Sequence, residues 1–103
     1  MYMTVFRNRK RADMDVPAYQ ADNARMEELV AALPGFISIK GFVAEDGEVV
    51  AISLWESEEA AKAWANHPEH LRVQARGRSD YYESYTVFSC TDPRVRSYER
   101  PLA

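Results

Sequence analysis

An Asp-Gly pair at positions 46 and 47 separates two apolar runs that each have the pattern of a β-strand. In the run 36–45, apolar residues such as Ile37 and Ile39 alternate with polar ones, and residues 49–55 form the returning run. Alternation with a period of two is typical of a strand with one solvated face, and Asp-Gly is a strong signal for a tight hairpin because both residues tolerate positive φ. The sequence therefore predicts that these two strands pair antiparallel.

Helical and strand patterns surround this hairpin on both sides. The expected elements are a strand over 1–7, a helix over 18–33, a helix capped by Ser57 that runs through Trp64, a break at 66–68, a second helical piece from Pro68 to about Arg78, a strand over 81–90 and a short closing strand over 95–98. Helical spacing of apolar residues, capping residues and prolines support the helices. The order β-α-β-β-α-β predicts an α+β, ferredoxin-like fold, an antiparallel sheet with the helices on one face.

The other face of this sheet is expected to be partly apolar, because Phe36 and Phe42 share the parity of the polar positions in their strand. A partly apolar, uncovered sheet face needs a partner. Two such sheets packed face to face predict a homodimer, a dimeric α+β barrel in which both copies use the same surface. At 103 residues the chain fits one domain, 1–103, which gains stability from a second subunit.

Charge and cysteine content exclude several classes of function. A net charge of −3 argues against a nucleic-acid partner, and the basic run 7–11, followed by Asp13 and Asp15, is interpreted as a solvated turn. The single cysteine, Cys90, lies in an apolar run and is interpreted as a buried, inert thiol. No stretch approaches the roughly 18 apolar residues of a membrane span, so we expect no membrane partner and a cytoplasmic location.

Several segments resemble a known family. They are Pro34-Gly35-Phe36, Ser53-Leu54-Trp55, Glu58-Glu59-Ala60 with Ala63-Trp64, Asn66-His67-Pro68-Glu69-His70, Gln74-Ala75-Arg76-Gly77-Arg78, a tyrosine-rich last strand and Val95-Arg96-Ser97-Tyr98-Glu99. Together they cover nearly the whole chain and resemble the antibiotic biosynthesis monooxygenase family. The resemblance implies a dimeric ferredoxin-like barrel. Some members of that family oxidise aromatic polyketides with O₂ and without metal or flavin, and another branch degrades haem.

The leading hypothesis is therefore a cofactor-independent monooxygenase that acts on a small planar aromatic compound. We expect Asn8, Trp64 and His70 to line its pocket, with His70 as the base because an imidazole titrates near neutral pH. Asn8 could donate to a substrate oxygen or a bound O₂ species. The alternatives are a turn position for Asn8 after the first strand, core packing for Trp64 and a structural role for His70.

Other residues are expected to contact the substrate, namely Trp55, His67, Gln74, Arg78 and Tyr85. Tyr85 could donate a hydrogen bond to a phenolate-like substrate, and Arg78 could hold an anionic group. Core packing for Trp55, aromatic packing for Tyr85 and pairing with acidic residues for Arg78 remain open alternatives. His67 and His70 supply only two ligands, with no Asp or Cys at ligand spacing beside them, so no metal is expected.

Two rival functions remain. In the haem-degrading branch the resemblance matches Asn8 and Trp64, but Gln74 stands where that branch has its histidine, and an amide is a poor iron ligand. His70 lies one helical turn before Gln74 and could face the same way. Haem binding and degradation is thus a second hypothesis, and no cofactor is the leading expectation. The third is a non-enzymatic dimeric module that binds small molecules.

Overall fold

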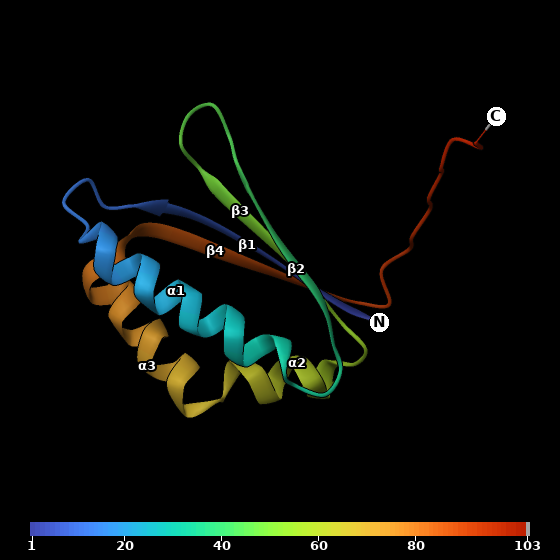
Figure 1. Ribbon diagram of the computed structural model, residues 1–103, viewed down its shortest axis with the longest axis horizontal. Helices are drawn as coiled ribbons and strands as arrows, with labels where there is room; N and C mark the ends of the chain where they lie inside the picture. Colours follow the sequence, from blue (N-terminus) through green and yellow to red (C-terminus); the bar gives the residue numbers. More distant parts are fainter. Residues whose placement is uncertain (103) are drawn as a thin grey trace.

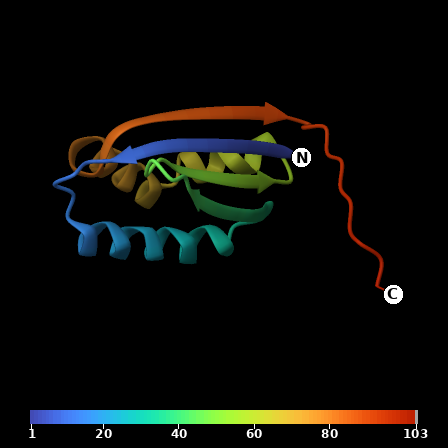
Figure 2. The same cartoon turned by 90° about the horizontal axis from the view of Figure 1, so that it is seen from above.

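The computed structural model of the chain describes residues 1–102. Its elements follow in this order: β1 (Tyr2–Lys10), α1 (Val16–Ala31), β2 (Phe36–Val43), β3 (Val49–Trp55), α2 (Glu58–Ala65), α3 (Pro68–Arg76), the π-helical turn η1 (Gly77–Tyr81) and β4 (Tyr82–Thr91). The strands form one antiparallel sheet in the order β2-β3-β1-β4, and the helices lie on one side of it (Figure 1; Figure 2). The predicted ferredoxin-like α+β fold is confirmed, with its second helix divided into α2 and α3.

Side chains at the helix starts explain where the helices begin. Asp15 accepts a hydrogen bond from the backbone N–H of Ala18 at the start of α1, and Ser57 accepts one from that of Ala60 at the start of α2. The Nδ1 atom of His67 accepts from the N–H of Glu69, so the imidazole caps α3 directly before Pro68. Each cap satisfies a donor that has no partner inside its own helix. The sequence predicted the Ser57 cap and the break before Pro68 correctly.

The apolar core joins α1, α2 and β3 through Val30, Trp55 and Ala61. Phe36 packs on it edge to face, with its ring centroid 5.4 Å from that of Trp55. The expectation that Phe36 lies on the uncovered face is wrong. The pairing of β2 with β3 shifts between Phe36 and Ser38, and this one-residue bulge turns Phe36 toward the helices.

The hairpin between β2 and β3 forms as predicted, but its loop is longer than the Asp-Gly pair alone. β2 ends at Val43, and the N–H of Ala44 donates to the carbonyl oxygen of Glu48 across the hairpin. Gly47 has a φ of 89°, whereas Asp46 does not adopt a positive φ. A left-handed glycine after a turn is the usual geometry of a three-residue hairpin loop.

The first strand is longer than predicted, and the C-terminal segment is less regular. β1 continues to Lys10, so Asn8 lies inside a strand rather than in a turn, and most of the basic run 7–11 belongs to the sheet. The closing strand expected at 95–98 does not form within the described chain. Residues 93–102 leave the sheet after β4 and extend away from it (Figure 1; Figure 2).

The face of the sheet opposite the helices is strongly apolar. Strand register places the following side chains on it: Met3, Val5, Phe42, Val50, Ile52, Leu54, Phe88 and Cys90. Phe42 and Phe88 are about half exposed, and Cys90 is exposed, so the expectation of a buried thiol is wrong for this chain. Within residues 1–102, no helix is long and apolar enough to cross a membrane.

Candidate functional site

A cavity of about 580 Å³ lies between the helices and the inner face of the sheet. β1 contributes Phe6 and Asn8, α1 contributes Met26, and α2 and α3 contribute Trp64 and His70. A concave, mainly apolar space with a few polar groups is the usual form of a small-molecule site. The cavity is therefore the candidate functional site.

His70 offers this cavity an imidazole that is fixed at one edge. Its Nδ1 atom lies 3.1 Å from the carbonyl oxygen of Trp64 and 3.0 Å from Nε2 of Gln74, which also donates to the carbonyl oxygen of Ala65. Nδ1 donates to the carbonyl in one tautomer and accepts from the amide in the other. No residue within 1–102 bonds its Nε2. With Nδ1–H on the carbonyl, the lone pair of Nε2 is free to accept a proton.

Burial is the main influence on the acidity of His70. It lowers the pKa of the imidazole, and the carbonyl oxygens of Trp64 and Ala65 oppose part of this effect. The neutral form is thereby favoured near pH 7. A neutral imidazole with a free Nε2 can act as a base toward a ligand in the cavity.

Asn8 is 4% exposed and lies on the inner strand β1, opposite Val49 on β3 and Tyr85 on β4. Its Oδ1 accepts a hydrogen bond from the ammonium group of Lys10, two residues further along the same face. Since Oδ1 is occupied, the amide NH₂ is the group that Asn8 can present to a ligand.

Aromatic rings from β1 and β4 form one wall of the cavity. Phe6 contacts Tyr82 and Tyr85 edge to face, with centroid separations of 5.4 and 5.5 Å. In β4 the register shifts so that Glu83 is an extra residue between the partners of Arg9 and Lys10. This bulge places Tyr82 on the same face as Tyr85, although the two are three residues apart.

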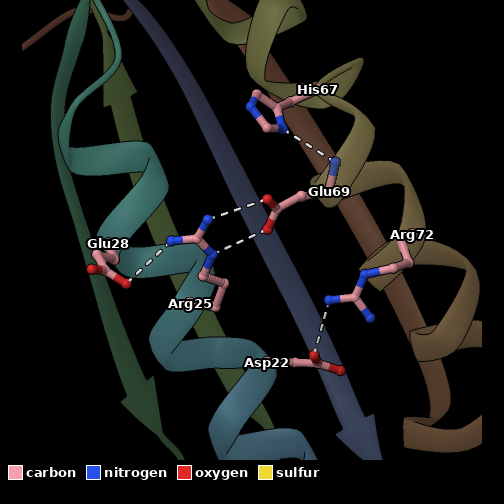
Figure 3. Close-up of polar contacts among 6 residues, drawn as sticks. All are labelled: Asp22, Arg25, Glu28, His67, Glu69 and Arg72. Carbon is pink, nitrogen blue, oxygen red and sulfur yellow. Dashed lines mark hydrogen bonds and ion pairs between the residues drawn. The ribbon is translucent and has the colours of Figure 1, made fainter.

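A polar seam between α1 and α3 runs along another side of the site, and Figure 3 shows its members. Arg25 on α1 donates from Nε and Nη2 to the two carboxylate oxygens of Glu69 on α3, at 3.1 and 3.2 Å. One turn earlier on α1, Asp22 accepts a hydrogen bond from Arg72 of α3 at 3.2 Å. We call Asp22, Arg25, Glu69 and Arg72 the α1–α3 seam. Arg25 and Glu69 are partly exposed, so their pair stabilises the fold only modestly, whereas Asp22 is buried.

The buried end of this seam is the carboxylate of Asp22. It accepts from the hydroxyl of Tyr81 at 2.6 Å, and Arg72 and Arg76 lie at 3.2 and 3.4 Å. Burial raises the pKa of Asp22, but the bonds from Tyr81 and Arg72 and the two positive charges outweigh it, so that the net pKa is lowered. Burial together with the same carboxylate raises the pKa of Tyr81 to about 12.

The structure brings most of the predicted site residues together. Those that line the cavity are Asn8, Trp55, Trp64, His70, Gln74, Arg78 and Tyr85. His67 does not line it and instead caps α3. Trp55 is 2% exposed and belongs to the core as well as to the cavity wall. Among residues 1–102, no group of three or more His, Cys, Asp or Glu side chains could hold a metal ion.

The sequence pattern did not point to Tyr19 and Tyr82, which line one end of the cavity, or to Lys10, whose ammonium group lies against both rings. Lys10 could have been found by continuing the alternation of Phe6 and Asn8 through the basic run, because it shares their parity. No comparable signal identifies Tyr82, since its orientation depends on the bulge at Glu83.

Fold and cavity together define a ferredoxin-like α+β protein with a ligand-sized space under its helices. Residues 1–76 match the family described as antibiotic biosynthesis monooxygenase, and the chain belongs to that family. The uncharacterized protein YqjZ of Bacillus subtilis (strain 168) is 36% identical over 75 residues, which make up 73% of this chain. The matched part spans 66% of YqjZ, slightly under two thirds of its length.

Solved structures of low sequence identity share the fold. The Mycobacterium tuberculosis protein Rv0793 superposes with a TM-score of 0.78 at 21% identity, over 93% of this chain and 98% of that one. SnoaB, a cofactor-independent oxygenase from Streptomyces nogalater, superposes with a TM-score of 0.72 at 18% identity, over 91% of this chain and 94% of that one. At such identities these similarities concern the fold alone.

Proposed function

We propose that the chain is a monooxygenase of the antibiotic biosynthesis type that oxidises a small planar aromatic compound with O₂, without metal or flavin. The observation that carries this proposal is the cavity of about 580 Å³, with the free Nε2 of His70 at its edge and aromatic rings along its wall. Family membership and the fold shared with a cofactor-independent oxygenase support it.

The chemistry needs a substrate that supplies its own electrons. A methylene carbon between aromatic rings, as in a hydroxyanthrone, loses a proton to Nε2 of His70 and leaves a delocalised carbanion. The carbanion gives its electrons to O₂ and forms a carbon–oxygen bond. The resulting hydroperoxide loses water, so that CH₂ and O₂ become C=O and H₂O. The protein binds and orients the substrate, takes the first proton and excludes bulk water.

Asn8 and Trp64 have supporting roles in this proposal. The amide NH₂ of Asn8 is placed to donate to the substrate oxygen that gains negative charge on deprotonation. Trp64 supplies one flat face next to the imidazole and holds the ring of His70 in place.

We also propose that the chain acts as a homodimer. The apolar outer face of the sheet, from Met3 to Leu54 across β1 and β3, would be covered by the same face of a second copy. The extended residues 93–102 are free to reach the partner.

Oxygen uptake tests the activity directly. The purified protein should accelerate O₂ consumption with at least one hydroxyanthrone or related phenol in an oxygen-electrode screen, whether or not a chelator is present. His70→Gln should greatly reduce the acceleration. If ligands raise the melting temperature but none supports O₂ uptake, the protein is a binding module instead.

Haem binding is the alternative function, and it can be tested separately. No imidazole occupies position 74, and Nδ1 of His70 is engaged by the helix, which leaves Nε2 of His70 as the nitrogen that an iron could reach. A Soret shift on titration with haemin would favour haem binding, and an unchanged spectrum would end that hypothesis.

A further inference from the structure

The ammonium group of Lys10 lies directly behind one end of the cavity wall, in contact with three residues that line the cavity. Its Nζ donates to Oδ1 of Asn8 and lies 5.0 Å from the ring centroid of Tyr19 and 5.3 Å from that of Tyr82. The side chain is half-buried. Ring faces attract a cation, but they do not neutralise its charge.

No carboxylate within residues 1–102 forms an ion pair with Lys10. The two acidic residues that line the cavity are both engaged elsewhere: Asp22 with Tyr81 and arginines, and Glu27 as the acceptor of a hydrogen bond from Asn23. Many other basic side chains of the described chain have an acidic partner, as Arg7 has Glu48 and Arg9 has Asp46. Arg78 lines the cavity and also forms no ion pair within residues 1–102, but it is exposed to solvent, whereas Lys10 is half-buried. Lys10 is therefore a partly buried cation without a counter-charge.

The tyrosines around Lys10 do not supply this charge either. Burial raises the pKa of the Tyr19 hydroxyl, and burial together with neighbouring tyrosines raises the pKa of the Tyr82 hydroxyl further. Both phenols thus stay neutral near pH 7. Desolvation in turn lowers the pKa of Lys10, because its charged form has lost water and gained no anion.

We propose that Lys10 is the specificity-determining residue of the cavity and that it selects ligands carrying an ionised phenol or enol, whose oxygen pairs with the Lys10 ammonium group. An anionic oxygen at this place would restore the missing counter-charge in a site with little water, where a charge-assisted hydrogen bond is strong. The aromatic body of the ligand would then lie along Tyr82 and Phe6. This inference rests on the proposed function for the class of ligand, but not on turnover.

A spectroscopic probe tests the inference without any reaction. 7-Hydroxycoumarin is planar and aromatic, and its phenol and phenolate forms absorb at different wavelengths; 7-methoxycoumarin has the same shape but cannot ionise. Bound to the native protein, 7-hydroxycoumarin should ionise at a pH about one unit below that of the free probe, which corresponds to phenolate binding about tenfold more tightly than phenol. In Lys10→Met this shift should vanish, while 7-methoxycoumarin should bind within about twofold of its native affinity.

Two further variants control for charge. Lys10→Arg should keep at least part of the shift, because the positive charge remains. Lys62→Met removes the same charge from the exposed surface of α2 and should leave the shift unchanged. If the bound probe ionises as easily in Lys10→Met as in the native protein, the proposal is wrong.

Three other outcomes of the coumarin experiment also distinguish the Lys10 proposal from the monooxygenase proposal. If the Lys10→Met variant no longer binds 7-methoxycoumarin either, Lys10 has a structural role in the cavity wall and the proposal fails. If neither coumarin binds the native protein, the proposed aromatic ligand class fails and the inference fails with it. If the shift depends on Lys10 but no substrate supports O₂ uptake, the Lys10 proposal stands and the monooxygenase proposal fails.

Discussion

The imidazole of His70 stacks on the indole of Trp64, with ring centroids 4.3 Å apart and an interplanar angle of 20°. The backbone carbonyl of Trp64 also lies within hydrogen-bond distance of Nδ1 of His70. One residue of α2 therefore fixes both the plane and the edge of a side chain on α3. The break between these helices, at Pro68, is what brings the two rings face to face.

His70→Gln should lower kcat/KM for O₂ uptake by roughly 10²- to 10⁴-fold, the usual contribution of a general base. Burial lowers the pKa of His70 below 6.5, so in the native protein the base form persists and activity should fall only at a pH below that value. The pH profile of kcat/KM measures this acidic limb. His67→Gln, which alters the cap of α3 outside the cavity, should retain the limb; its loss there would argue against His70 as the base.

Tyr81→Phe should decrease the free energy of unfolding by about 1–3 kcal/mol, because it removes the buried bond to Asp22 from a residue that is 1% exposed. Urea denaturation measures the change. Tyr98→Phe is the matched control, since Tyr98 is largely exposed and should change stability by no more than about 0.5 kcal/mol. Equal effects of the two substitutions would contradict a stabilising role for the bond.

Phe88→Glu should convert a dimer into a monomer, because it places a charge on the apolar outer face of the sheet. Sedimentation velocity at micromolar concentration gives the result. Val16→Glu makes the same change at an exposed position at the start of α1 and should leave the dimer intact. A native protein that sediments as a monomer would refute the dimer itself.

Gly77→Ala should distort the aromatic wall of the cavity. A Cβ atom at Gly77 would lie 2.7 and 2.9 Å from two carbons of the Tyr82 ring, which is closer than such atoms can approach. The ring must move, and the contact of Lys10 with it should change. We expect weaker binding of both coumarins together with a lower melting temperature. Unchanged binding would mean that the ring position matters little to the ligand.

The sequence predicted the element order and the hairpin because these depend on local patterns: alternation over 36–43, helical spacing in α1 and caps such as Ser57. It misplaced Phe36, since parity arguments assume an unbroken ladder. A bulge of one residue reverses the parity on one side of it. Bulges depend on packing across the sheet, which no single strand encodes.

His70 and Trp64 were expected at the pocket from the residues themselves, and both line the cavity. Lys10 was missed because the charged residues around it suggested a turn. The strand in fact continues to Lys10, so that Lys10 lies on the inner face and its neighbour Arg9 on the outer face. Arg7 and Arg9 project from the other face and pair with Glu48 and Asp46 at the hairpin end. The arginines on the outer face of β1 thus form ion pairs, whereas Lys10 on its inner face lies against tyrosine rings.

Two parts of α1 are held to the rest of the protein by different forces. Near its C-terminal end Val30 packs with Trp55 and Ala61 in the apolar core, whereas the middle of the helix meets α3 through the α1–α3 seam. Apolar contact hardly responds to dissolved ions, but partly exposed ion pairs are screened by them. Raising the ionic strength should therefore weaken the partly exposed Arg25–Glu69 pair between α1 and α3, while the apolar contacts of Val30 and the buried bond between Asp22 and Tyr81 remain.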